Sequence, residues 1–178
     1  EETGLMDSRA IFRPIVPVYD LLNRLLSLGI DQSWRREAAR RFSGGRVLDL
    51  ACGTGDLALA LAPRCRVIGA DILPEMLARA NAKKKNARYY FPLIAAAGEA
   101  LPFTNASMDG VTVAFGVLNF ADRHAGLRAV RTVLEPHVVG PGEHHLVVLD
   151  PLVAGLDVVQ KLLGGWSAIG QRGAGRHP

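Results

Sequence analysis

Cysteine and aromatic residues are scarce in this chain of 178 residues. The two cysteines, Cys52 and Cys65, are too few for a disulfide framework, and neither lies in a CxxC pair, so a reduced, cytoplasmic setting is expected. No apolar run reaches the roughly 18 residues that span a bilayer. The N-terminus has no basic segment followed by an apolar one, which disfavours a secretory signal. Aromatic residues make up 6% and do not alternate with the basic clusters, so no nucleic-acid partner is expected.

Motifs for metal binding and for nucleophilic catalysis are missing as well. His124, His144 and His145 belong to no Cys/His/Asp set with ligand spacing, and adjacent histidines on a strand point to opposite faces. No GxSxG or Walker pattern occurs. Cys52 has no basic partner in the sequence and is expected to pack rather than react. We therefore expect no metal site and no covalent nucleophile.

The remaining composition is that of a soluble globular protein with a net charge of +4. Its length fits one domain with a sizeable core. Basic residues gather in two clusters, Arg35, Arg36, Arg40 and Arg41 in the first and Lys83, Lys84 and Lys85 in the second. The clusters are interpreted as solvated helix faces, and contact with an anionic membrane surface is the alternative.

Helical spacing precedes the first expected strand. Residues 1–17 are expected to be irregular because two prolines oppose a helix there. The leucines of 21–28 share one helical face, and periodicity assigns most of them to the core. Asp31 is expected to cap a second helix, in which Trp34 is predicted to be a core anchor.

From residue 46 onward, short apolar runs alternate with helical segments. Strands are expected at 46–51, 66–70, 88–96, 110–116 and 145–150, and helices at 56–62, 74–85, 122–134 and 155–166. Pro92 suggests that the third strand lies at an edge. The alternation predicts an α/β fold with a doubly wound, mostly parallel sheet. We divide this single domain into an N-terminal helical cap (1–45), an α/β core (46–150) and a C-terminal helix with a loose tail (151–178).

The central motif is VLDLACGTGDLA, residues 47–58. Gly53 and Gly55 permit a tight turn after the first strand, and the next helix offers free N–H groups to a ligand. The GxGxxA pattern alone also fits a nicotinamide dinucleotide, so an NAD-binding oxidoreductase is an alternative. Asp49 favours S-adenosylmethionine, because an acid here suits a cationic ligand better than a pyrophosphate. The same carboxylate can instead order the turn by accepting N–H bonds.

The ends of the next three strands supply further candidate cofactor contacts. Asp71 ends the second strand, where a carboxylate can bind both ribose hydroxyls, although a helix-capping role is the alternative. Ile72 is placed to pack on an adenine. The segments AAAGEALPF (95–103) and VAFGVLN (113–119) follow the third and fourth strands, beside the adenine and the methyl group in a methyltransferase. Taken alone, each is a core strand and a turn.

Together these segments resemble the ubiquinone/menaquinone biosynthesis C-methyltransferase family. The resemblance covers residues 19–35, 47–61, 69–83, 98–103 and 114–136. It implies a seven-stranded fold, S-adenosylmethionine as the methyl donor and a ring carbon of a prenylated, demethylmenaquinol-like precursor as the acceptor. Membership puts five residues at cofactor-contact positions, namely Thr54, Asp71, Ala97, Gly98 and Ala114. Tyr19 falls in an N-terminal segment that would cover the site.

The sequence departs from the family pattern in four places, of which the one at Ala97 removes a polar contact on the adenine side. Ala97 stands where members usually have Asp or Asn, and Leu118 replaces an Arg thought to help activate the substrate carbon. Extra residues separate Pro136 from Gly142, and the final strand pair has no counterpart. Asn119 remains as the catalytic candidate, but a neutral amide orients a substrate and does not accept its proton. These departures predict a weak or inactive catalyst.

Two explanations for such a chain stay open. One is an enzyme whose base is Glu99, a histidine or the substrate phenolate. The other is a non-catalytic S-adenosylmethionine-binding paralogue, or a fragment that needs a partner. A lipidic quinol would be covered by Phe12, Tyr19 and the leucines of 21–28. Peripheral membrane contact and a homodimer are the associations considered.

Overall fold

Five parallel strands form one sheet in the part of the chain that the computed structural model describes, residues 13–28, 30–87, 89–114, 116, 119–134 and 145–149. The strands are β1 (Arg46–Leu50), β2 (Arg66–Asp71), β3 (Leu93–Ala95), β4 (Gly110–Ala114) and β5 (His145–Leu149). They lie in the order β3-β2-β1-β4-β5, and every neighbouring pair is parallel. The expected parallel sheet is confirmed.

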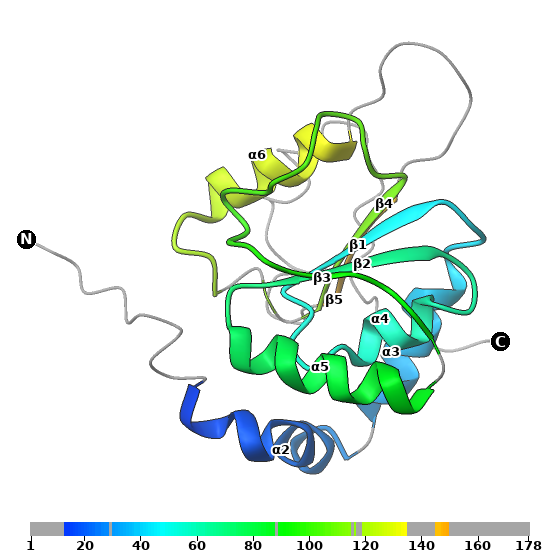
Figure 1. Ribbon diagram of the computed structural model, residues 1–178, viewed down its shortest axis with the longest axis vertical. Coiled ribbons are helices and arrows are strands. Elements are labelled where there is room, and N and C mark those ends of the chain that lie inside the picture. The colour runs from blue at the N-terminus through cyan, green and yellow to red at the C-terminus, as the bar shows by residue number, and fades with distance from the viewer. Residues whose placement is uncertain are drawn as a thin grey trace, which may run out of the picture.

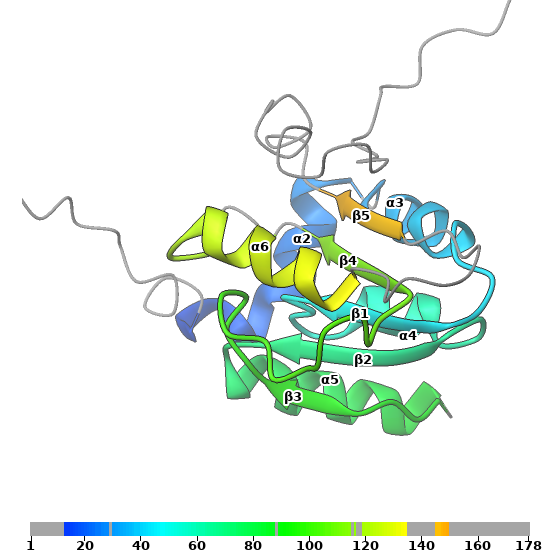
Figure 2. The same cartoon turned by 90° about the horizontal axis from the view of Figure 1, so that it is seen from above.

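Helices cover both faces of this sheet (Figures 1 and 2). Helices α3 (Ile30–Arg40), α4 (Asp56–Leu61) and α5 (Pro74–Ala87) lie on one face, and α6 (Arg123–Leu134) lies on the other. The short 3-10 helix η1 (Arg13–Val18) and helix α2 (Tyr19–Leu26) precede them. The layering confirms the doubly wound α/β architecture.

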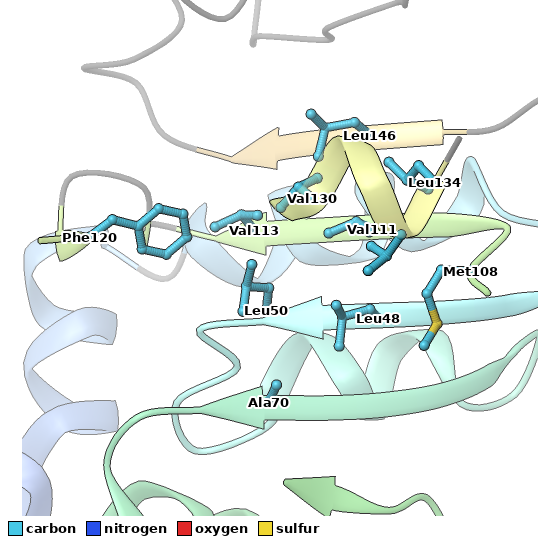
Figure 3. Packing of buried hydrophobic residues seen from close by; sticks show 11 residues of the cluster. Leu48, Leu50, Ala70, Met108, Val111, Val113, Phe120, Val130, Leu134 and Leu146 are labelled. Carbon is cyan, nitrogen blue, oxygen red and sulfur yellow. The ribbon is translucent and has the colours of Figure 1, made fainter. Parts of the chain in front are cut away.

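Alternating side chains on the central strands produce two separate apolar layers. Val47 on β1 packs toward α3 and α4, together with Ala38, Leu57 and Leu61. Leu48, the next residue, is buried on the opposite face with the apolar side of α6. Figure 3 shows this second layer, in which Leu48, Leu50, Val111, Val113, Val130, Leu134 and Leu146 converge between the sheet and α6.

The direction of winding reverses at β1. The chain runs outward from β1 through β2 to the edge strand β3, and then returns to place β4 on the other side of β1. The carboxyl ends of β1, β2 and β4 therefore surround the switch point, where ligands bind in open parallel sheets. The described candidate residues that follow these strands lie on this side of the sheet, at the carboxyl ends of the strands; below, this side is called the carboxyl edge.

The edges of several elements differ from the sequence predictions. Residues 13–18 form η1 although Pro14 and Pro17 lie within it, because a 3-10 turn tolerates them. Strand β3 covers only Leu93–Ala95, because Pro92 has no N–H for the ladder. Its carbonyl still accepts the Gly69 N–H at 3.0 Å. The edge position predicted from this proline is confirmed.

Two predictions for the N-terminal helices are wrong. Helix α3 begins at Ile30, so Asp31 lies inside it, and the Ser27 hydroxyl accepts the Asp31 N–H at 3.4 Å instead. Leu21, Leu25 and Leu28 are not core residues, because they are 58%, 62% and 86% exposed. Trp34, which was predicted to be a core anchor of the second helix, is half-buried.

Other predictions fall on parts of the chain outside the described residues. These are the helix at 155–166, the loose tail, the extra residues between Pro136 and Gly142, the missing final strand pair, and the positions of Phe12 and Leu118. Within the described residues, no helix is long and apolar enough to cross a membrane.

Candidate functional site

A strained turn of residues 51–55, called the glycine turn below, follows β1. Gly53 and Gly55 have φ angles of +54° and +83°, and Ala51 adopts +54° without being a glycine. A methyl group on Gly55 would lie 3.0 Å from the Ala80 Cβ on α5, so a side chain would be crowded as well as strained there. The turn is tied to its neighbour strand by the Cys52 N–H, which donates to the Ala70 carbonyl at 3.0 Å. The glycines are therefore required by conformation and by close approach.

Asp71, at the end of β2, supports the glycine turn directly. Its Oδ2 accepts the Gly53 N–H at 2.8 Å, and its Oδ1 accepts the Leu73 N–H at 2.9 Å. Burial raises the pKa of this carboxyl, and the backbone hydrogen bonds partly offset that effect. The structure thus gives Asp71 a role at the turn and at the start of α5, while its contact with a ribose stays a prediction. Each oxygen retains a lone pair for that contact.

Asp49 lies fully buried beneath the glycine turn, facing the first turn of α4. Its Oδ1 accepts the Thr112 hydroxyl at 2.9 Å, and no described residue hydrogen-bonds its Oδ2. Burial raises its pKa to about 7, although Thr112, Arg35 and the Ala58 backbone oppose this shift. The carboxylate has no exposed surface in the described structure, so any influence on a cofactor would pass through the turn. Its contact with a cofactor stays a prediction.

Thr54 belongs to a charged network that sequence reasoning missed. Its hydroxyl donates to Asp20 on α2 at 2.6 Å and accepts from the Lys83 ammonium on α5 at 2.8 Å. Lys83 also pairs with Asp20 at 2.7 Å and with Asp56 at 2.6 Å. Arg35 lies 3.7 Å from the other oxygen of Asp56. Thus α2, α3, α4 and α5 are joined around the glycine turn.

Tyr19 covers the same turn from α2. A methyl group on Gly53 would lie 3.8 Å from the Tyr19 Cε1, in ordinary van der Waals contact with the ring. Tyr19 also packs on a small apolar cluster of Val16, Leu73 and Met76. The expectation that this N-terminal segment covers the site agrees with its position in the structure.

The segments that follow β3 and β4 are closely packed, the first against Phe120 and the second against the glycine turn. Gly98 is buried, and a methyl group on it would lie 2.6 Å from the Phe120 ring. Gly116, just beyond β4, would meet the Ala51 Cβ at 2.4 Å. Ala97 and Ala114 are half-buried, and Ile72 is 37% exposed. The predicted contact positions therefore lie along the carboxyl edge.

The candidate catalytic groups lie beside this packing. Asn119 is exposed, and its backbone N–H donates to the Gly116 carbonyl at 3.0 Å. The Glu99 carboxylate accepts the Asp122 N–H at 3.1 Å, so it supports the start of α6. His124 is exposed on α6. The described structure assigns none of these groups a catalytic contact.

Cys52 is a packing residue, as expected. It is buried beside Gly69, where a methyl group would lie 3.1 Å from its sulfur. Burial raises the pKa of its thiol well above the ordinary value, which makes the reactive thiolate scarce. The described residues contain no cluster of three or more His, Cys, Asp or Glu side chains able to hold a metal ion.

The two basic clusters are only partly solvated. Arg36, Arg40, Arg41 and Lys85 are exposed, as predicted. Arg35 is not, because its side chain is 11% exposed and pairs with Asp31 and Asp56. Lys84 donates to the Phe91 carbonyl at 2.8 Å and lies 5.0 Å from the Tyr90 ring centroid. Charge runs in a sequence do not reveal which members turn inward.

Comparison with known proteins gives one consistent result. Residues 3–149 match the model of the ubiE/COQ5 methyltransferase family. A ubiquinone/menaquinone biosynthesis C-methyltransferase UbiE of Citrifermentans bemidjiense is 44% identical over 136 residues, which are 71% of this chain and 58% of that protein. A demethylmenaquinone methyltransferase of Thermus thermophilus is 48% identical over 132 residues, which are 71% of this chain and 60% of that protein. The chain thus spans about three fifths of the length of these curated relatives.

Solved structures show the same fold. The YcgJ protein of Bacillus subtilis is 28% identical, with a TM-score of 0.54 over 58% of this chain and 45% of that chain. An S-adenosylmethionine-dependent methyltransferase structure from Methanococcus maripaludis, described as putative, has a TM-score of 0.63 over 83% of this chain and 66% of that chain. Its identity is 17%, so this likeness concerns the fold alone.

Proposed function

Because this chain belongs to the ubiE/COQ5 methyltransferase family, we propose that it binds S-adenosylmethionine and takes part in methyl transfer to a ring carbon of a quinol precursor. The family match across residues 3–149 carries this proposal. The geometry supports it, because the glycine turn and Asp71 lie together at the switch point of the sheet. The match also favours this cofactor over a nicotinamide dinucleotide.

The described residues fit the proposed cofactor. The methionine end would lie along 49–55, where the Tyr19 ring covers Gly53. The ribose hydroxyls would donate to Asp71, which retains unused lone pairs. The adenine would lie between the exposed Ile72 and the pair Ala97-Gly98, with Ala114 beside the methyl end.

Titration calorimetry of the whole chain tests cofactor binding. We expect S-adenosylmethionine and S-adenosylhomocysteine to bind and NAD to bind far more weakly. Stronger binding of NAD would replace this proposal with the oxidoreductase alternative. Absence of binding by all three ligands would contradict both.

The proposed acceptor is an amphiphilic, demethylmenaquinol-like ring. The relatives that bear quinone names support this substrate class, since identity to them reaches 48%. S-adenosylmethionine, when bound, supplies an electrophilic methyl group, and the product carbon must lose a proton. Among the described residues, Asn119 can orient the acceptor through its amide, while Glu99 is a carboxylate candidate for the base. Transfer only to a catechol or another non-quinoid acceptor would overturn the quinol assignment but leave the proposed methyltransferase activity standing.

We further propose that the chain as given is a weak catalyst. Ala97 and Leu118 bring no proton acceptor, and general-base help contributes roughly 10²–10⁴-fold. A single-turnover assay would compare the parent with the double variant Ala97→Asp/Leu118→Arg. A large gain supports a disabled enzyme of this family, whereas full activity in the parent contradicts the proposal. No activity in either protein favours a cofactor-binding module or a fragment that needs its partner.

A lipidic acceptor also suggests contact with the cytoplasmic face of a membrane through α2. Leu21 and Leu25 on this helix are exposed, as are Val18 before it and Leu28 after it. Arg24 on α2 is exposed as well, which favours an anionic surface. Apolar side chains beside a basic residue suit the boundary between headgroups and acyl chains.

Sedimentation with lipid vesicles tests this contact. The chain should sediment with vesicles that contain phosphatidylglycerol and much less with phosphatidylcholine alone. Leu25→Asp should weaken this binding, whereas Tyr90→Asp is the matched control, because Tyr90 is 89% exposed elsewhere. Equal loss in both variants would indicate a general charge effect and not a membrane face on α2.

A further inference from the structure

Asp20, Thr54 and Lys83 form a closed hydrogen-bonded ring, called the ring below. Thr54 donates to Asp20 and accepts from Lys83, and Lys83 returns to the second oxygen of Asp20. Lys83 uses its remaining proton on Asp56 at 2.6 Å. All three donors of this ammonium therefore have acceptors. Because each donor proton of Thr54 and Lys83 has an acceptor, the ring is a specific arrangement and not a chance surface pair.

The ring is fixed to the most strained part of the candidate site. Thr54 lies between Gly53 and Gly55, which both have positive φ, and it is 2% exposed. Such a backbone persists only when its surroundings stabilise it. The ring therefore joins helix α2 to the middle of the turn along which the cofactor is proposed to bind.

Asp20 is the member of the ring that can separate most easily. Lys83 also binds Asp56, and Thr54 belongs to the turn itself, so both stay in place if α2 moves away. In the part of the chain that the structure describes, the Asp20 carboxylate contacts Thr54 at 2.6 Å and Lys83 at 2.7 Å. Its neighbour Tyr19 covers Gly53, so movement of α2 would uncover the turn.

We propose that Asp20 is a positioning residue that holds α2 as a lid on the glycine turn, and that release of its bonds to Thr54 and Lys83 limits the entry and exit of S-adenosylmethionine. The inference rests on the proposed function, since it concerns the cofactor of that site. The apolar cluster of Val16, Leu73 and Met76 does not involve Asp20, so loss of the carboxylate leaves a folded chain.

Stopped-flow measurement of S-adenosylhomocysteine exchange tests the lid. Asp20→Asn keeps the shape of the side chain and an acceptor for Thr54, but it removes the charge that binds Lys83. Loss of a hydrogen bond to a charged group corresponds to roughly tenfold or more. We expect the association and dissociation rates both to rise by about this factor, with a smaller change in their ratio. Asp20→Glu should restore slow exchange, and Glu37→Gln on the exposed side of α3 is the matched control.

Hydrogen exchange on the cofactor-free chain gives a second measurement. Amides of residues 19–26 should exchange faster in Asp20→Asn, while those of β1 and β4 stay unchanged. Unchanged ligand rates in a variant that still binds S-adenosylhomocysteine would overturn the lid and leave the proposed function standing. If the parent binds no S-adenosylhomocysteine, the proposed function fails first, and the lid fails with it. A rise in dissociation alone would also contradict the lid, because it would mean a lost contact and not a faster opening.

Discussion

The glycine turn and the packing around Phe120 both lie at the carboxyl edge of the sheet, but different forces stabilise them. Asp71 and Thr54 hold the turn through charged and backbone hydrogen bonds. Phe120 fills the space that Gly98 and Gly126 leave, and a methyl group on either glycine would come within 2.6 Å of its ring. The first region depends on charge and proton positions, while the second depends on volume.

Because of this difference, the stability of the two regions should respond to different changes. A hydrogen-bonded carboxylate responds to pH and to loss of its charge. A close-packed ring responds to added or removed methyl groups. Substitutions in the glycine turn should therefore have effects that depend on pH. Substitutions in the packing around Phe120 should have effects that a compensating change in volume can reverse.

The largest expected effect is the pH dependence caused by Asp49. Its pKa is raised from 3.8 to about 7, so the folded chain holds a proton that the unfolded chain releases across this interval. The stabilising effect of that proton is present below pH 4 and is lost as pH rises toward 7. Linkage sets the loss at up to about 4 kcal/mol.

Denaturant unfolding of the parent and of Asp49→Asn between pH 4 and 8 measures this effect. The variant keeps an acceptor for Thr112 and cannot ionise, so its advantage in unfolding free energy should grow across the interval. Asp71 is present in both proteins, and because its charge helps to raise the pKa of Asp49, the difference includes the coupling between the two carboxyls. A difference that stays flat would mean that Asp49 is ionised beside Arg35 throughout.

Asp71→Ala should have the next largest effect. Gly53 and Leu73 would each lose an acceptor for a backbone N–H. We expect a loss of about 2–3 kcal/mol in the free energy of unfolding, and affinity for S-adenosylmethionine lower by roughly tenfold or more. Asp71→Asn, which keeps one carbonyl oxygen, should lose less of both. Reduced stability with unchanged affinity in calorimetry would limit Asp71 to supporting the turn.

In the packed region, Gly126→Ala should destabilise the chain by about 1–2 kcal/mol. Its new methyl group would lie 2.4 Å from the Phe120 ring, which outweighs the preference of a helix for alanine, about 1 kcal/mol. In a Phe120→Ala background the ring atoms that would meet this methyl group are absent, so the same change should become stabilising. A double-mutant cycle by urea unfolding measures this reversal, and equal effects in both backgrounds would contradict the packing explanation.

Sequence periodicity predicted the helices and strands of the core because burial determines both the spacing of apolar residues in the sequence and the side of each element that packs inward. The strands at 46–51 and 66–70 and the helix at 74–85 agree with β1, β2 and α5 within two residues. The positions of Gly53 and Asp71 at adjoining strand ends followed from the parallel order. These predictions needed only local pattern and topology.

The contacts of charged side chains were not predictable in this way. Asp20 and Lys83 meet only because α2 and α5 both border the glycine turn, and no local spacing indicates that pairing. The leucines of 21–28 have the periodicity of core residues, yet Leu21, Leu25 and Leu28 are exposed, because periodicity does not reveal whether a partner covers the face. The cap of α3 was misassigned because the helix begins at Ile30, one residue before Asp31, after a turn in which Leu28 has a φ of +51°.

The smallest expected effect comes from Ala97→Asp, which adds a carboxylate to the packed region. Ala97 is half-buried beyond β3 and is proposed to lie beside the adenine, whose amino group can donate to an acid. The neighbouring Ala96 N–H donates to the Asp71 carbonyl at 3.1 Å, so the new charge enters the carboxyl edge beside an existing carboxylate. Repulsion between them reduces the benefit, and we expect affinity for S-adenosylhomocysteine to rise by about three- to tenfold. Calorimetry should show no gain with the inosyl analogue, which has a carbonyl in place of that amino group, nor with Ala100→Asp, an exposed control. An equal gain for both ligands would mean that the charge acts at long range and that Ala97 does not border the adenine.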